Sequence, residues 1–166
     1  MTNPPVLFDA SSILNLVREL RQDAPDKLLE GSTITLAYYE IGNALWKECF
    51  LLKRITNTEA ENLLTAIFAI IAEMKATTPS QQDKGKTTLE TAVKHKLTFY
   101  DAAYLTEAKN TKSTLVTDDK KLADTAKKTQ TKTQTSKEFT NKPNTKKTKQ
   151  KPYSLTSCSN HNYDNA

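Results

Sequence analysis

The chain has 166 residues, of which 37% are hydrophobic and 26% charged, and its formal net charge is +5. This length suits one domain of ordinary size with a polar extension. The sequence has neither a disulfide or metal-binding cysteine pattern, nor an apolar run of about 18 residues, nor a signal peptide, so we expect a cytoplasmic protein without membrane association.

The positive charge is concentrated in the last segment of the chain. Residues 141–166 carry five lysines, one acid and two prolines, with almost no large aliphatic side chains. Such a composition cannot bury enough apolar surface to fold. We therefore predict a domain over residues 1–140 and a basic, disordered tail over 141–166. The near-neutral domain predicts no basic nucleic-acid face, and the tail adds at most nonspecific affinity for phosphates.

The first half of the chain predicts two strand–helix units followed by a long helix. A strand over 6–8 precedes a helix, and a β-branched strand over 32–36 precedes another helix from about Ala37. Thr58 and Glu61 resemble the start of a third helix, which extends to Met74. Its wide apolar arc packs in the core or meets a partner chain, and the core is the favoured interpretation.

The second half continues the alternation of helices and short strands. We predict a helix over 87–96, a strand over 97–99, a helix over 101–109, a strand over 113–117, a further helix and a weak strand over 131–135. Strands that alternate with helices form parallel sheets through right-handed crossovers. The expected fold is α/β, a three-layer α/β/α sandwich with a short, mostly parallel central sheet.

Acidic residues follow the predicted strands. Asp9 follows the first strand, Asp101 follows "LTFY", the pair Asp118 and Asp119 follows "TLVT", and Glu40 lies one turn into the helix after "STITL". Each aspartate alone could simply cap a helix, but Glu40 lies inside its helix and cannot. Because the carboxyl ends of parallel strands share one edge of the sheet, we expect these acids to meet there.

Several carboxylates in one pocket require a counter-ion. Like charges about 4 Å apart repel by roughly 1–4 kcal/mol per pair, depending on the dielectric. No arginine or histidine follows these strands, so a hard divalent cation, Mg²⁺ or Mn²⁺, is the natural candidate. Such a cation can activate water for attack on a phosphate ester.

Four segments carry a family resemblance. In chain order, "VLFDASSIL", "YYEIGNALWKE", "LTFYDAAYL" and "LVTDDKKLA" resemble the acidic motifs of PIN-domain nucleases, especially the VapC-like toxins of toxin–antitoxin pairs. The match covers about residues 4–140. The resemblance implies a PIN-like fold and an Mg²⁺- or Mn²⁺-dependent endoribonuclease that cleaves RNA. It also implies a toxin that forms a homodimer and is silenced by a cognate antitoxin.

The resemblance also assigns roles to residues. Asp9 and Asp101 would bind the metal directly, with Glu40 and Asp119 completing the acidic pocket. Asp118, which spacing cannot separate from Asp119, would be the variable residue of its motif and a possible helix cap. The secondary candidates are hydroxyls that could orient water or phosphate and side chains that could contact the substrate: Ser11, Thr117, Asn43 and Lys47.

Two other classes of protein compete with the nuclease. A phospho-receiver or phosphatase-like α/β domain also gathers acids at strand ends, but it would need a second acid beside Asp9, and "FDASSI" has none. An inactive scaffold that binds RNA or protein through the same fold is the other alternative. The presence of all four acids argues against the scaffold.

Overall fold

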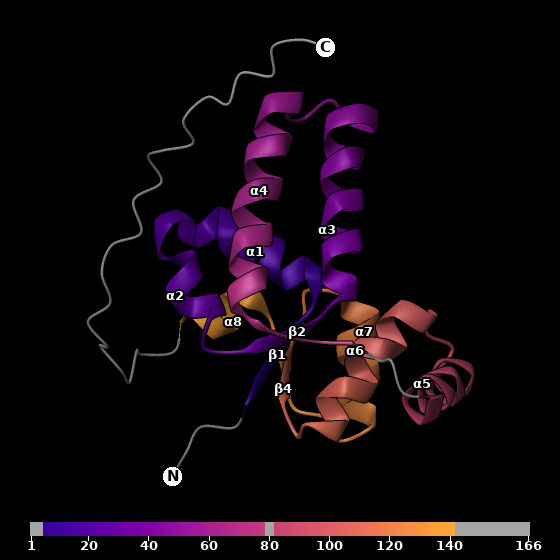
Figure 1. Ribbon diagram of the computed structural model, residues 1–166. Coiled ribbons are helices and arrows are strands. Elements are labelled where there is room, and N and C mark those ends of the chain that lie inside the picture. Colours follow the sequence, from indigo (N-terminus) through magenta and orange to yellow (C-terminus); the bar gives the residue numbers. More distant parts are fainter. Residues whose placement is uncertain (1–4, 79–81, 142–166) are drawn as a thin grey trace, which may run out of the picture.

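A computed structural model describes residues 5–78 and 82–141 of the chain (Figure 1). Apart from Asn141, the predicted tail lies outside the described residues.

A five-stranded parallel sheet forms the centre of the domain, and its strand order is β3-β2-β1-β4-β5. The strands are β1 (Val6–Phe8), β2 (Ser32–Ile34), β3 (Lys75–Thr77), β4 (Thr114–Val116) and β5 (Thr133–Gln134). Leu7 pairs with Ser32 on one side and with Leu115 on the other. The predicted α/β class is confirmed, and the central strand is the one that precedes Asp9.

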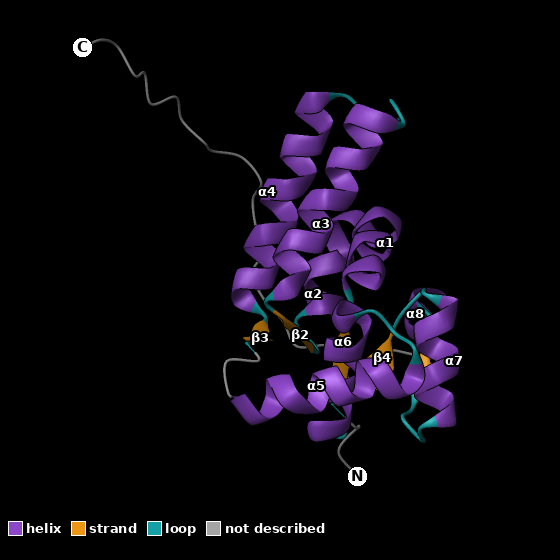
Figure 2. Cartoon of the chain, turned by 90° about the vertical axis from the view of Figure 1, so that its right-hand side faces the viewer, coloured by secondary structure: helices purple, strands orange, loops and turns teal. Residues whose placement is uncertain are grey.

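Helices connect the strands and cover both faces of the sheet (Figures 1 and 2). They are α1 (Ala10–Leu20), α2 (Ala24–Leu28), α3 (Leu36–Trp46), α4 (Asn57–Glu73), α5 (Gln82–His95), α6 (Phe99–Asn110), α7 (Lys120–Lys128) and α8 (Ser136–Thr140). A 3₁₀ turn, η1 (Arg21–Asp23), follows α1, and a π-helical turn, η2 (Lys47–Leu51), continues α3. Together α3 and α4 project beyond the sheet as a two-helix arm.

Alternating side chains of the strands build two apolar clusters, one on each face of the sheet. Phe8 and Val116 belong to the cluster that also contains residues of α1, α3 and α4. Their neighbours Leu7 and Leu115 belong to the cluster that contains residues of α6 and α7. Successive residues of a strand point to opposite faces, so these short strands are buried on both sides, as the predicted three-layer sandwich requires.

Two predictions about strands were wrong. Residues 97–99 do not form a strand, because the Thr98 hydroxyl accepts a hydrogen bond from the Asp101 amide and starts α6 at Phe99. Strand β3 was not predicted, since "KAT" offers little apolar signal, yet it pairs along its full length with β2.

Predictions of helix limits were less accurate than predictions of helix existence. The capping box of α4 consists of Thr56 and Glu59, two residues before the predicted pair Thr58 and Glu61. Helix α5 begins at Gln82 instead of residue 87. The short helices α2 and α8 were not predicted, because about five residues are too few to show a helical period.

The apolar arc of α4 packs mainly in the core. Ile67, Ile71 and Met74 are buried, whereas Leu63 and Leu64 are partly buried against the same cluster. Packing in the core, the favoured interpretation of this arc, is therefore confirmed for the second half of α4, which leads into β3. Within the described ranges, no helix has the length and apolar character that crossing a membrane requires.

Candidate active site

Asp9 lies at the carboxyl end of the central strand and is 4% exposed. It is the N-cap of α1, and its carboxylate accepts hydrogen bonds from the Ser12 amide at 2.7 Å and the Thr117 hydroxyl at 2.5 Å. The Ser11 hydroxyl lies 2.9 Å from both carboxylate oxygens. Burial raises the pKa of Asp9, and these hydrogen bonds oppose that rise. Asp9 is therefore both a helix cap and a buried acid, and none of the described cationic side chains forms an ion pair with it.

Glu40 and Asp101 share the neighbourhood of Asp9. Glu40, on α3, is half-buried, and its carboxylate accepts a hydrogen bond from the Tyr104 hydroxyl at 2.8 Å. Burial raises the pKa of Glu40, as do the negative charges of Asp9 and Asp101, while the Tyr104 hydrogen bond lowers it. Three predicted acids from distant parts of the sequence therefore interact electrostatically.

Asp101 reaches this position differently from the prediction. It lies in the first turn of α6 and is not the residue that caps the helix. Its carboxylate accepts a hydrogen bond from the Thr98 hydroxyl at 2.8 Å. A capped helix, not a strand, therefore supplies the third carboxylate.

Asp119 is exposed and connects to Asp9 through Thr117. The Asp119 amide donates to the Thr117 hydroxyl oxygen at 3.1 Å, and that hydroxyl donates to Asp9. Asp119 also caps α7, because its carboxylate accepts from the Leu122 amide at 2.7 Å. Asp119, and not its neighbour Asp118, is therefore the residue that caps this helix.

Asp118 instead joins two helices. One of its carboxylate oxygens accepts from Asn15 on α1 at 2.8 Å, and the other accepts from the Ser136 amide at the start of α8 at 3.0 Å. Its own amide points to the Ser11 hydroxyl at 3.4 Å. Both carboxylate oxygens thus have structural partners.

The remaining secondary candidates differ in their relation to the acids. Ser11 and Thr117 bind the Asp9 carboxylate, so both hydroxyls belong to the cluster. Asn43 and Lys47 are exposed, three and seven positions after Glu40. Among the described residues, no hydrogen bond or ion pair joins either of them to the acids.

The donor set suits a hard divalent cation in its chemistry. Carboxylate and hydroxyl oxygens are the ligands that Mg²⁺ and Mn²⁺ prefer, and among the described residues no lysine, arginine or histidine pairs with Asp9, Glu40 or Asp101. Within those same ranges, no three acidic, histidine or cysteine side chains already lie close enough together to hold a metal ion. The acids are therefore coupled electrostatically, as a cation site requires, but the described side chains do not form a complete coordination shell.

Sequence reasoning missed two polar residues of this region. Tyr104 binds Glu40, and its position three residues after Asp101, on the same side of α6, was the available signal. Ser12 is fully buried, and its hydroxyl donates to the Asp9 and Val116 carbonyl oxygens, both at 2.9 Å. A serine in a first helical turn gives no sequence signal for this bridge.

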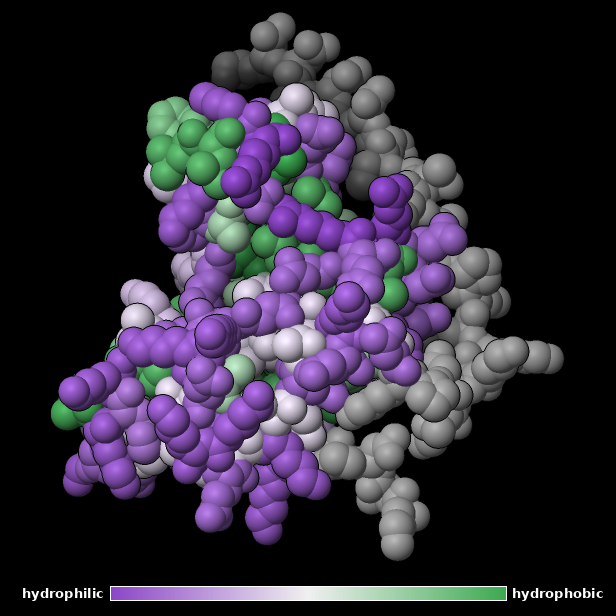
Figure 3. All heavy atoms as spheres, turned by 180° about the vertical axis from the view of Figure 1, so that it is seen from behind, coloured by the Kyte–Doolittle hydropathy of each residue, from purple (hydrophilic) through white to green (hydrophobic). Residues whose placement is uncertain are grey.

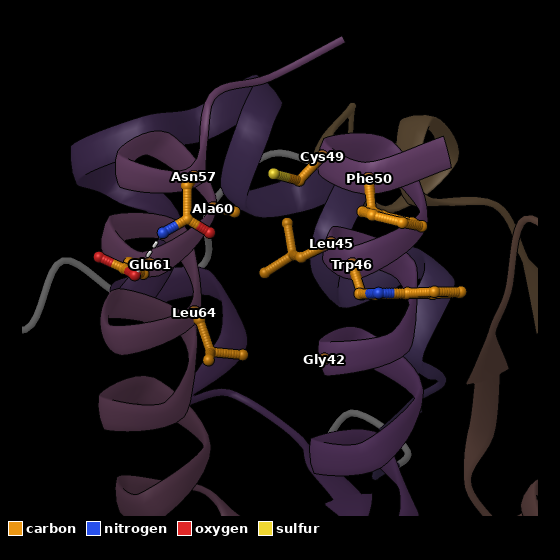
Figure 4. A pocket seen from close by; sticks show the side chains of 9 residues that line it. All are labelled: Gly42, Leu45, Trp46, Cys49, Phe50, Asn57, Ala60, Glu61 and Leu64. Carbon is orange, nitrogen blue, oxygen red and sulfur yellow. Dashed lines mark hydrogen bonds between the residues drawn. The ribbon is translucent and has the colours of Figure 1, made fainter. Parts of the chain in front are cut away.

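A separate apolar groove lies on the arm, away from the acids. It has a volume of about 290 Å³ and lies between α3 with η2 and α4 (Figure 4). Its lining residues are Gly42, Leu45, Trp46, Cys49, Phe50, Asn57, Ala60, Glu61 and Leu64. Figure 3 shows hydrophobic side chains gathered at the tip of the arm, above a mostly hydrophilic body.

Comparison with known proteins places the chain in a family. No family model matches it. A curated relative named Ribonuclease VapC3, from Pyrobaculum aerophilum, is 32% identical over 126 residues, which cover 72% of this chain and 92% of the relative. The crystal structure of PAE2754 from the same organism has a TM-score of 0.60 and 28% identity, and it covers 73% of this chain and 85% of that one. The chain therefore belongs to the VapC-like family of PIN-domain ribonucleases.

Proposed function

We propose that this protein is a metal-dependent endoribonuclease that hydrolyses RNA phosphodiester bonds in the cytoplasm and acts as the toxin of a toxin–antitoxin pair. The observation that carries the proposal is the electrostatic coupling of Glu40 to Asp9 and Asp101, three acids with which no described lysine, arginine or histidine forms an ion pair. The likeness to a protein named as a ribonuclease supports the same activity.

The proposed roles follow from the position of each acid. Asp9 and Asp101 would hold the cation directly, Glu40 would complete its binding from α3, and Asp119 would complete the pocket from the start of α7. Asp119 suits this role better than Asp118, because Thr117 connects Asp119 to Asp9, whereas the Asp118 carboxylate joins α1 to α8. When bound, Mg²⁺ or Mn²⁺ would lower the pKa of water and stabilise the negative charge that develops on the phosphate.

Neutral groups of the chain prepare the site for this chemistry. Ser11 and Thr117 donate to Asp9 and so orient its carboxylate without neutralising it. Burial on the protein side of Asp9 strengthens its interaction with any cation that replaces the missing counter-charge. Because Asp119 is exposed, we expect an RNA strand to approach the acids from its side.

The test is RNA cleavage by the wild type with Mg²⁺ or Mn²⁺, with and without a chelator, beside Asp101→Asn. We expect cleavage that stops with the chelator and falls at least about 100-fold in the variant, because even residues that support metal ligands are worth about 10–100-fold. The Asp101 side chain is partly exposed, so the variant should keep its fold by circular dichroism.

Cleavage that persists without a metal would contradict the proposed metal dependence. Full activity of Asp101→Asn would contradict the role of Asp101 as a metal ligand. A folded wild type that binds RNA without cleaving it would instead favour the inactive scaffold. Cleavage products separated on a sequencing gel distinguish an endonuclease from an enzyme that trims ends.

We also infer that the arm contacts the cognate antitoxin. Trp46, Phe50, Leu51 and Leu52 are each at least half exposed near its tip, beside the apolar groove. Apolar patches with polar rims are typical of protein interfaces. An arginine-bearing or acidic segment of the same partner would enter the acidic pocket. The proposed homodimer rests on family membership.

The partner proposal is tested by co-expression with the product of a neighbouring short reading frame that encodes a DNA-binding protein. We expect the two proteins to co-purify. Phe50→Asp should weaken the complex at least about 10-fold, because it places a charge where the antitoxin would cover an aromatic ring. Leu89→Asp is the matched control, since Leu89 on α5 is 56% exposed and Phe50 is 58% exposed. Equal effects of the two substitutions on the complex would contradict the inference. Sedimentation of this protein without the antitoxin tests the proposed homodimer.

A further inference from the structure

Tyr104 is a buried phenol at the centre of the acidic cluster. It lies on α6, is 2% exposed, and packs in the apolar cluster on that face of the sheet. Its hydroxyl donates a hydrogen bond to Glu40 Oε2 at 2.8 Å. Its ring could pack equally well without the hydroxyl, so the oxygen has a role that packing does not explain.

The hydroxyl also lies near the start of α1, where the Ala10 backbone and the Asp9 charge both act on it. One side chain of α6, the helix that also carries Asp101, therefore binds Glu40 on α3 and lies close to the residue that follows Asp9. These three helices supply the three coupled carboxylates, and they meet at Tyr104.

The Tyr104 hydroxyl is the donor in its hydrogen bond to Glu40, and the burial of the ring fixes the position of that donor. Glu40, by contrast, has a long side chain and is repelled by Asp9 and Asp101. Without a fixed donor, that repulsion would favour rotamers that point the carboxylate away from the other acids.

We propose that Tyr104 is a positioning residue of the acidic site, whose hydroxyl holds the Glu40 carboxylate beside Asp9 and Asp101 so that the three can bind one divalent cation. This inference rests on the proposed function, since it assigns a residue to the metal-binding step of that reaction. Tyr104 acts through Glu40 and does not touch the substrate.

The variant Tyr104→Phe tests this role because it removes one oxygen and keeps the ring. We expect the affinity for Mn²⁺, measured by titration calorimetry without RNA, to fall about 10-fold, the size typical of groups that orient metal ligands. At saturating Mn²⁺, kcat should fall while KM for RNA stays within about twofold of the wild type. The fold, followed by thermal unfolding, should be retained.

Tyr39→Phe is the matched control. Tyr39 precedes Glu40 in the chain but is 80% exposed, so the same chemical change should leave Mn²⁺ affinity and kcat unaltered. A second control places Tyr104→Phe in a Glu40→Gln background. If Tyr104 acts through Glu40, its substitution should change Mn²⁺ affinity less than twofold there.

Three results would overturn the inference. A folded Tyr104→Phe variant with unchanged Mn²⁺ affinity and kcat would overturn it alone and leave the nuclease proposal intact. An unfolded Tyr104→Phe variant would show that the hydroxyl is structural. A wild type that neither binds Mn²⁺ nor cleaves RNA would overturn both the inference and the proposed function.

Discussion

Two acidic side chains are buried among the described residues, and their surroundings differ in kind. Glu107, near the end of α6, is 7% exposed, lies 3.6 Å from the Lys84 ammonium and accepts a hydrogen bond from Thr77 at 3.0 Å. Asp9 is 4% exposed, and its carboxylate accepts hydrogen bonds from the hydroxyls and amide of Ser11, Ser12 and Thr117. Within the described part of the chain, the first acid has a cationic partner and the second has none.

This difference separates a structural acid from a candidate functional one. A buried carboxylate with a cationic partner ties elements together, here α5, α6 and β3. When a buried carboxylate has only neutral hydrogen-bond donors, the loss of hydration on burial is only partly offset. In this site the charges of Asp9, Glu40 and Asp101 also repel one another. A positive charge from outside the chain would stabilise such an arrangement.

The largest effect that tests this comparison is on catalysis. Asp9→Asn should reduce RNA cleavage at least about 100-fold, because it removes a charge on which cation binding depends. Glu107→Gln should leave cleavage within about threefold of the wild type while lowering the free energy of unfolding by about 1–3 kcal/mol, the worth of a hydrogen bond to a charged group. Steady-state kinetics and urea unfolding of both variants measure the contrast, and similar activity losses would abolish it.

The next effect is on the pH dependence of stability. The raised pKa values of Asp9 and Glu40 mean that the folded protein binds protons more tightly than the unfolded chain. Their stabilising contribution is present below the ordinary values of 3.8 and 4.5, and it is lost as pH rises through the folded values. Without divalent cations, the melting temperature of the wild type should therefore fall relative to that of Asp9→Asn as pH rises from 4 to 7.

Saturating Mn²⁺ at pH 7 should raise the melting temperature of the wild type and not that of Asp9→Asn, because only the wild type gains the cation's stabilisation. Melting temperatures recorded in parallel, with and without the ion, provide the measurement. An identical pH profile for the two proteins would mean that Asp9 is not the acid whose burial matters.

The smallest effect concerns the cation of the structural acid. Lys84 is about one-third exposed in its ion pair with Glu107, so Lys84→Met should cost no more than about 1 kcal/mol of unfolding free energy. Raising the salt concentration to 1 M should shrink that cost, since salt screens exposed charges. If Lys84→Met lost more unfolding free energy than Glu107→Gln, and the loss persisted in 1 M salt, the Lys84–Glu107 pair would behave as a buried ion pair.

The sequence predicted four of the five strands, and the proximity of Glu40 to Asp9 and Asp101, because these signals are local. The apolar runs at Val6–Phe8 and Thr114–Val116 mark strands buried on both faces, and an acid after each marks the shared edge. The prediction of a strand over residues 97–99 was wrong because it relied on the apolar side chains of Leu97 and Phe99. Thr98 instead caps the helix that begins at Phe99. The position of Asp101 was nevertheless correct, because a helix start and a strand end can deliver a side chain to the same place.

What the sequence could not predict depends on contacts between distant residues. The bond from Tyr104 to Glu40 joins side chains 64 positions apart, and the role of Asp118 depends on Asn15 and Ser136. Adjacent aspartates look alike in the sequence, and only the packing of α1 and α8 separates them. Strand β3 is visible only through its pairing with β2.

The hydroxyl of Thr117 reaches Asp9 across 108 positions of the chain, and this separation has a consequence during synthesis. A nascent polypeptide that has emerged only as far as α6 contains three of the four acids but lacks β4, the neighbour of the central strand. Contacts between distant segments form late because the intervening chain must first be ordered. The acidic cluster, with Thr117 bound to Asp9, is therefore complete only after β4 and the start of α7 have been synthesised.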